Sequence, residues 1–111
     1  MDNIIRDKLP DRRGSITEKV THKLSNDVEM KMLVTFSFIS DTDRRIREIF
    51  CADFKAGSDF HTQLIDSSIL LSKLLQHGYT PTMLLASLSE PRSVIGSVLE
   101  AAVKLEQDLV P

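Results

Sequence analysis

The chain has 111 residues, of which 41% are hydrophobic and 27% charged, and its formal net charge at pH 7 is −2. This length fits one domain around a single hydrophobic core, and the balance of apolar and charged residues excludes an intrinsically disordered chain. No stretch reaches the roughly 18 consecutive apolar residues of a membrane span, and the first ten residues lack the apolar region of a signal peptide.

Cys51 is the only cysteine. A disulfide framework and a cysteine-based metal site within one chain are therefore excluded, and a cytoplasmic location is expected.

Charge is distributed unevenly along the chain. Residues 6–25 carry six basic and three acidic residues, whereas residues 56–111 carry three basic and six acidic ones. We therefore expect a basic arm over residues 1–15, followed by one domain over residues 16–111. A positive arm can meet a phosphate-bearing ligand, or it is simply a solvated segment. Because no aromatic residues interleave with these charges, no sequence-specific binding of nucleic acid is expected.

Three segments alternate between apolar and polar residues, which is the pattern of half-buried strands. They are Ile16 to Leu24, Val28 to Ile39, and Ile46 to Phe54. Short polar turns join them, so the pattern predicts an antiparallel meander with one face covered by other elements.

Alternation in the third segment assigns its residues to two faces. One face takes Ile46, Phe50, Ala52 and Phe54, and the other takes Arg47, Ile49, Cys51 and Asp53. By the same parity, Glu18 and Glu48 match the apolar faces of their strands. An inward carboxylate needs a basic partner, whereas one at a strand end reaches water. The candidate partners are Arg44, Arg45 and Arg92.

The period changes at residues 57–58 from two to about 3.6, which predicts a helix over residues 59–77. Ser58 is its expected N-cap, and Gly78 its expected end after His77. The helix is too apolar for one small sheet to cover. Its small residues allow close approach of another helix; they are Ser67, Ser68 and Ser72.

Two further helices are predicted. Thr80-Pro81 begins a short one that extends to about Leu88, and Ser93 caps a last helix over residues 93–109. Strands followed by helices predict an α+β fold: a three-stranded antiparallel β-meander, then two to three helices packed on the sheet.

No motif of a common enzyme class occurs, so we expect a non-enzymatic protein without a cofactor. His22 lies on a strand and His61 and His77 lie about four turns apart on one helix, so no metal site is expected. The remaining enzymatic hypothesis rests on Glu48, His61 or Asp66.

Helix N-termini offer candidate anion sites at residues 57–58 and 92–93, because exposed amide groups and the helix dipole favour negative charge. Capping alone explains the same residues. His61 either donates to a ligand or is simply exposed. Asp66 either binds a ribose hydroxyl or a partner's arginine, or is a solvent-side residue.

Four segments, in order, resemble a known family. They are LPDRRGSITEKVTH (9–22), REIFCADFKAGSDF (47–60), IDSSILLSKLLQHGYTPTMLLASLS (65–89) and SVIGSVLEAAV (93–103). Together they look like the TSCPD-type module near the carboxyl end of vitamin B12-dependent ribonucleotide reductases and its stand-alone bacterial and phage relatives. The naming tetrapeptide, the radical and cobalamin machinery and the carboxyl-terminal cysteine pair are absent. The resemblance implies a nucleotide-related context without reductase activity.

The layout is also similar to small phage proteins that sequester cyclic nucleotide immune signals and bind phosphates with arginines at subunit interfaces. By that fold-level analogy, the ligand-binding residues are Arg12, Arg13, Arg44, Arg45, Ser58, His61, Asp66, Arg92 and Ser93. We expect a homo-oligomer that assembles through helices 59–77 and 93–109 and binds a nucleotide or cyclic nucleotide. The competing hypothesis is a protein-interaction subunit that docks on a reductase or another enzyme and binds no small ligand.

Overall fold

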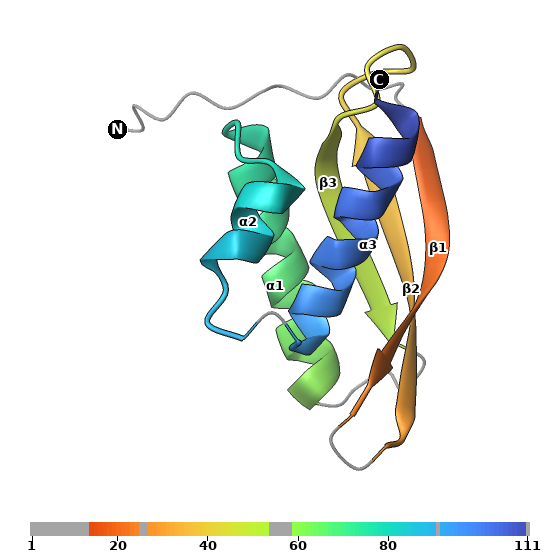
Figure 1. Cartoon of the computed structure of the whole chain (residues 1–111), viewed down its shortest axis with the longest axis vertical. Coiled ribbons are helices and arrows are strands. Elements are labelled where there is room, and N and C mark those ends of the chain that lie inside the picture. The colour runs from red at the N-terminus through yellow and green to blue at the C-terminus, as the bar shows by residue number, and fades with distance from the viewer. Residues whose placement is uncertain (1–13, 25–26, 54–58, 91, 111) are drawn as a thin grey trace.

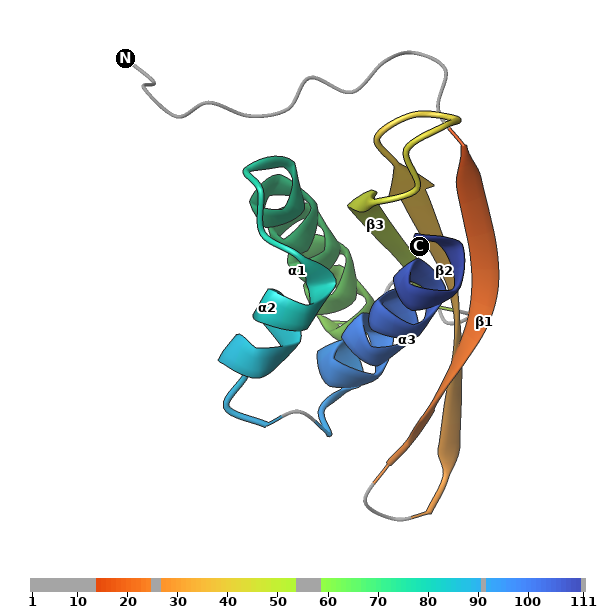
Figure 2. The same ribbon diagram turned by 45° about the horizontal axis from the view of Figure 1, so that its top comes forward.

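The computed structural model describes residues 14–24, 27–53, 59–90 and 92–110, which form one sheet covered on one side by helices. The strands are β1 (Ser15–Lys23), β2 (Glu29–Phe38) and β3 (Ile46–Asp53), antiparallel and in that order across the sheet. The helices are α1 (Asp59–Gln76), α2 (Pro81–Ser87) and α3 (Val94–Leu109). Figures 1 and 2 show all three on the same side of the sheet. The predicted α+β meander with its following helices is confirmed.

The core lies between the inner face of the sheet and helices α1 and α3. The central strand β2 supplies its fully buried side chains Met32, Val34, Phe36 and Phe38, at the alternating spacing that the sequence predicts. Each buried apolar side chain of this size stabilises the fold by about 1.5–3 kcal/mol. The helices contribute the buried residues Leu64, Leu71, Leu75, Val98, Leu99 and Ala102.

The predicted faces of β3 are wrong, because the strand carries a β-bulge. Its register with β2 shifts between Ser37 and Phe38, which pair with Glu48 and Ile46, so that Arg47 is the additional residue. A bulge of this kind reverses the side-chain parity beyond it. Ile46 is therefore buried, as expected, but the inward residues after the bulge are Ile49 and Cys51, while Phe50 is 53% exposed.

The two strand carboxylates consequently differ. Glu18 lies half-buried on the inner face of β1, opposite Val34, as its parity predicts. Glu48 lies opposite Ser37, on the outer side of the sheet that also carries Phe50.

Small polar residues of α1 face the free edge of β3. Ser72 Oγ accepts a hydrogen bond from the Ile49 N–H (2.9 Å), and Ser68 Oγ accepts one from the Cys51 N–H (3.2 Å). The prediction that these two serines allow another helix to approach closely is wrong, because the element that approaches them is the strand β3. Only Ser67 lies near another helix, at the start of α3.

Two longer side chains extend this cover along β3. Gln76 Nε2, at the end of α1, donates to the Arg47 carbonyl oxygen (3.3 Å), and Glu106 Oε2 of α3 accepts from the Ile46 N–H (2.8 Å). Side chains from two helices thus satisfy the main-chain groups of β3 that a neighbouring strand would otherwise satisfy.

The predicted helix ends are confirmed where they are described. Thr80 Oγ1 accepts from the Met83 N–H and caps α2, at 3.1 Å. Gly78, with φ of 103°, follows α1 in the left-handed conformation that glycine tolerates best. His77 Nδ1 lies 2.7 Å from the Lys73 carbonyl oxygen in the last turn of α1. The predicted N-cap Ser58 lies outside the described residues.

Replacing Ser93 with alanine is expected to lower the free energy of unfolding by about 1 kcal/mol. Ser93 Oγ accepts a hydrogen bond from the Gly96 N–H (3.1 Å) and so satisfies one amide at the start of α3. Urea unfolding measures the change. The exposed Ser89 is the control, since no cap depends on it, and equal losses for the two variants would contradict the capping role.

None of the helices in residues 59–90 and 92–110 combines the length and apolar character needed to cross a membrane.

Candidate functional site

One end of the molecule gathers arginines around the loop between β2 and β3; we call Gly14, Phe38, Arg44 and Arg45 the arginine end. The Arg44 guanidinium lies over the Phe38 ring, with Cζ 5.2 Å from the ring centroid, a cation–π contact. A Cβ atom added to Gly14 would come within 2.7 Å of Arg44 Nη1. Gly14 therefore lies directly against this guanidinium. Arg12 and Arg13 precede Gly14 in the sequence and lie outside the described residues.

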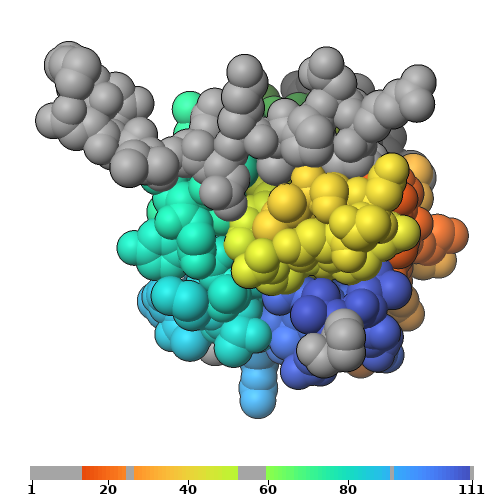
Figure 3. All heavy atoms as spheres, turned by 90° about the horizontal axis from the view of Figure 1, so that it is seen from above, coloured from red at the N-terminus to blue at the C-terminus, as the bar shows by residue number. Residues whose placement is uncertain are grey.

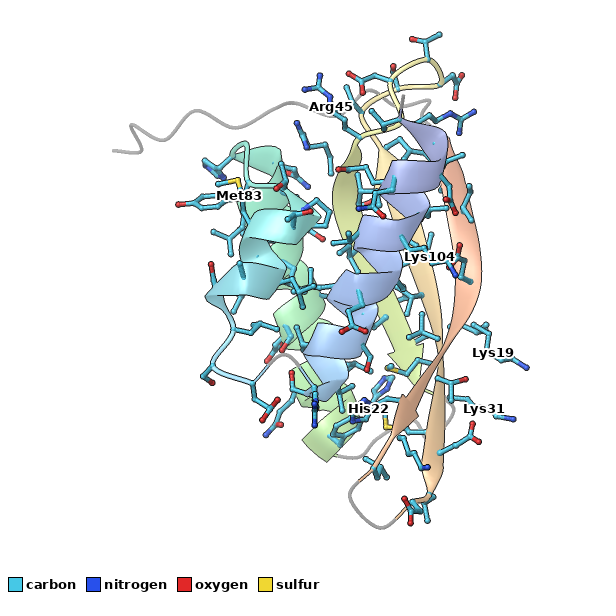
Figure 4. The ribbon with its side chains drawn as sticks, viewed as in Figure 1. Lys19, His22, Lys31, Arg45, Met83 and Lys104 are labelled. Atoms are coloured by element: carbon cyan, nitrogen blue, oxygen red, sulfur yellow. The ribbon has the colours of Figure 1, made fainter. Side chains whose placement is uncertain are left out.

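Arg45 is held in place by Asp43. Arg45 Nε donates to Asp43 Oδ1 (3.1 Å), and Nη2 donates to Oδ2 (2.7 Å). The hydrogen bonds from Arg45 lower the pKa of the Asp43 carboxyl from 3.8 to about 2. Figure 4 shows Arg45 at this end. Figure 3 shows the β2–β3 loop in yellow, flanked by the end of α3 in blue and by the α1–α2 connection in teal.

We expect the pH dependence of stability to carry a small contribution from Asp43. Its folded-state pKa of about 2 lies below its ordinary 3.8, so the stabilisation is fully present above pH 3.8 and is lost as the pH falls through 2. Because both side chains are partly exposed, the contribution is below about 1 kcal/mol. In Asp43→Asn, the unfolding free energy measured with urea should decrease less at acid pH than in the unmodified protein, by that amount. An unchanged decrease would contradict the stabilising role of Asp43.

The start of α3 lies at the opposite end of the molecule (Figure 1). Arg92 is exposed there, and its main-chain N–H donates to Glu90 Oε1 (2.9 Å). Ser93 caps α3 and borders an open groove of about 250 Å³ between the first turns of α1 and α3. His61 is half-buried in the first turns of α1. The groove is lined by Phe60, Gln63, Leu64, Ser67, Ser93, Val94 and Ile95.

The predicted site residues that the structure describes therefore form separate groups. Arg44 and Arg45 lie together, and the first turn of α1, which contains His61, lies at the same end of the molecule as the start of α3 (Figure 1). Asp66 is exposed midway along α1 and belongs to neither group. Among the described residues, no cluster of three histidine, cysteine or acidic side chains is placed to hold a metal ion.

Five of the exposed large apolar side chains lie on α1 and the segment after it. This α1–α2 face consists of Ile69, Leu70, Leu74, Tyr79 and Met83, each between 39% and 63% exposed. Figure 4 shows Met83 on the outward side of α2, away from the sheet. Helix α3, the second helix predicted to mediate assembly, has no comparable apolar surface. Its exposed positions are polar, and its buried apolar residues face the core. Sequence reasoning missed Met83, because α2 is too short to define its faces, and Tyr79, because it lies in the connection before that helix.

A histidine–serine contact also escaped sequence reasoning. His22 Nδ1 lies 2.7 Å from Ser97 Oγ and joins β1 to α3. A separation of 75 residues leaves no local signal for such a pair. Burial raises the pKa of the Cys51 thiol, so this cysteine is a poor nucleophile.

Comparison of the chain with protein-family models, with curated proteins and with solved structures finds no match.

Proposed function

We propose that this chain is a non-enzymatic, homo-oligomeric binding module that takes a nucleotide-like, phosphate-bearing ligand at its arginine end. The observation that carries the ligand class is the contact between Arg44 and Gly14. Arg44 and Arg45 lie together at this end, and two further arginines, Arg12 and Arg13, directly precede Gly14 in the sequence.

Guanidinium groups suit such a ligand chemically. Their planar donor forks match phosphate oxygens in bidentate geometry, and they keep their charge at any physiological pH. Phe38 and Asp43 hold the guanidinium groups of Arg44 and Arg45 in the free protein. Less side-chain entropy is then lost when an anion binds.

Assembly is supported by the α1–α2 face. Five large apolar side chains of this face are exposed on α1 and the segment after it, and exposed apolar surface of this kind on a small protein marks an interaction surface. We propose that a second copy covers it, and that the TSCPD-like stretch at residues 9–22 supplies the nucleotide context. A cytoplasmic location belongs to the same proposal, because a single cysteine cannot form a disulfide within the chain.

Thermal unfolding with a panel of mono-, di- and cyclic nucleotides tests the ligand. A ligand that binds only the folded state at 100 times its Kd should raise Tm by roughly 10 °C. We expect at least one nucleotide class to do so, and Arg44→Ala to abolish the shift. Arg92→Ala, at the opposite end, is the matched control and should retain it.

The second candidate function is a protein-interaction subunit without a small ligand, and the α1–α2 face is the observation that favours it. No Tm shift with any nucleotide, together with a stoichiometric partner such as a reductase bound to that face, would replace the first proposal by this one.

A further inference from the structure

The two edges of the sheet are treated differently. The β3 edge is covered, because Ser68 and Ser72 of α1 accept from its main-chain N–H groups. Main-chain groups that are satisfied in this way cannot pair with another strand.

The β1 edge has no such cover. Among residues 14–24, 27–53, 59–90 and 92–110, no side chain is hydrogen-bonded to the main chain of residues 15–23. The described contacts of β1 side chains are the hydroxyl pair of Thr17 with Thr35 and the bond of His22 to Ser97. In Figures 1 and 2, β1 forms the rim of the sheet, and no labelled helix lies beyond it. Nine residues of strand therefore present one side of their main chain for pairing.

We propose that β1 pairs antiparallel with β1 of a second copy, about a two-fold axis at Val20, so that two sheets join into one of six strands. Charge selects this occupant and this register. An axis at Val20 places Glu18 opposite His22 of the second copy on the inner face. On the outer face, Lys19 and Thr21 lie opposite each other.

Neighbouring registers are worse. An axis at Lys19 sets that lysine against its own copy, and an axis at Glu18 does the same for the carboxylate. Like charges directly opposite each other destabilise a strand pair, and the axis at Val20 creates no such pair. Lys19 points away from the helices (Figure 4), so water solvates its ammonium group when β1 is unpaired. When β1 pairs with a second copy, the residue opposite Lys19 must be neutral.

This contact is independent of the proposed function, because the β1 edge and the α1–α2 face lie on opposite sides of the molecule (Figure 1). Two different self-complementary contacts on one chain build a closed tetramer or an extended array.

Disulfide trapping tests both the pairing and its register. Directly opposite residues in an antiparallel pair have Cβ atoms about 4.5–5.5 Å apart, close enough for a disulfide after small adjustment. Lys19→Cys and Thr21→Cys chains are prepared separately, mixed and exposed to oxidised glutathione. We expect a covalent dimer in the mixture and none from either variant alone.

Both positions are exposed, so these substitutions leave the core intact, and thermal unfolding verifies the fold. Lys31→Cys, on the central strand, replaces Lys19→Cys as the control and should give no dimer with Thr21→Cys. A dimer from Lys19→Cys alone, or no dimer from the folded mixture, overturns the proposal. Repeating the trap with Leu70→Asp in both chains keeps the result independent of the α1–α2 face.

Discussion

Replacing Leu70 with aspartate is expected to remove one interface from the assembly. Leu70 is the most exposed large apolar residue described on α1, at 63%, so the change leaves the core of each subunit intact. In a symmetric contact the substitution acts twice. A central side chain that contributes at least about 2 kcal/mol then weakens association on the order of a thousandfold.

Sedimentation velocity measures this change. The mass should fall to that of a monomer if the α1–α2 face is the sole interface, and to that of a dimer if the β1 edge also pairs. Lys104→Asp is the matched control, because it places the same carboxylate on the exposed side of α3. An unchanged mass for Leu70→Asp, or an equal loss for Lys104→Asp, contradicts assembly through α1.

The double substitution Ser68→Ala and Ser72→Ala is expected to lower the free energy of unfolding by roughly 2–4 kcal/mol. Both hydroxyl groups are buried, and each accepts from a main-chain N–H of β3. Alanine fills nearly the same space but leaves the two buried donors without a partner. The energy lost is therefore the cost of the unsatisfied donors rather than of a cavity.

Urea unfolding of the double variant is compared with that of Ser67→Ala. Ser67 is a neighbour in sequence, half-buried beside the groove, and no main-chain donor of β3 depends on it. We expect a change within about 0.5 kcal/mol for this control. Similar losses for both proteins would show that helix propensity or packing, and not the strand edge, sets the effect.

The order of elements followed from the sequence because each signal is local. Alternation along residues 29–38 places every second side chain on one face. Capping residues such as Thr80 and Ser93 satisfy amide groups only a few positions away. These interactions join residues that are close in the chain, so the elements they form can be predicted from a single sequence.

The bulge in β3 could not be predicted in this way. It depends on the pairing of Ser37 and Phe38 with a strand whose register is set by the whole sheet. Parity counted along β3 alone therefore put Phe50 and Ile46 on the same face. The roles of Ser68 and Ser72 escaped for the same reason, since their partners lie 17 and 23 residues away.

The candidate site was predictable only in its parts. Sequence reasoning identified Arg44 and Arg45 as candidates, but the contact of Arg44 with Gly14 is a property of the folded sheet. Arg92 was grouped with them by residue type, whereas the turn before α3 lies at the far end of the molecule (Figure 1). Charge and residue type indicate the chemistry of a site, but only the fold shows which residues lie together in it.

Self-association is the claim on which the assembly rests, and light scattering of the unmodified chain at high micromolar concentration tests it most directly. We expect a mass of at least two monomers, each of 12.5 kDa. A mass of one monomer throughout that concentration range would contradict it.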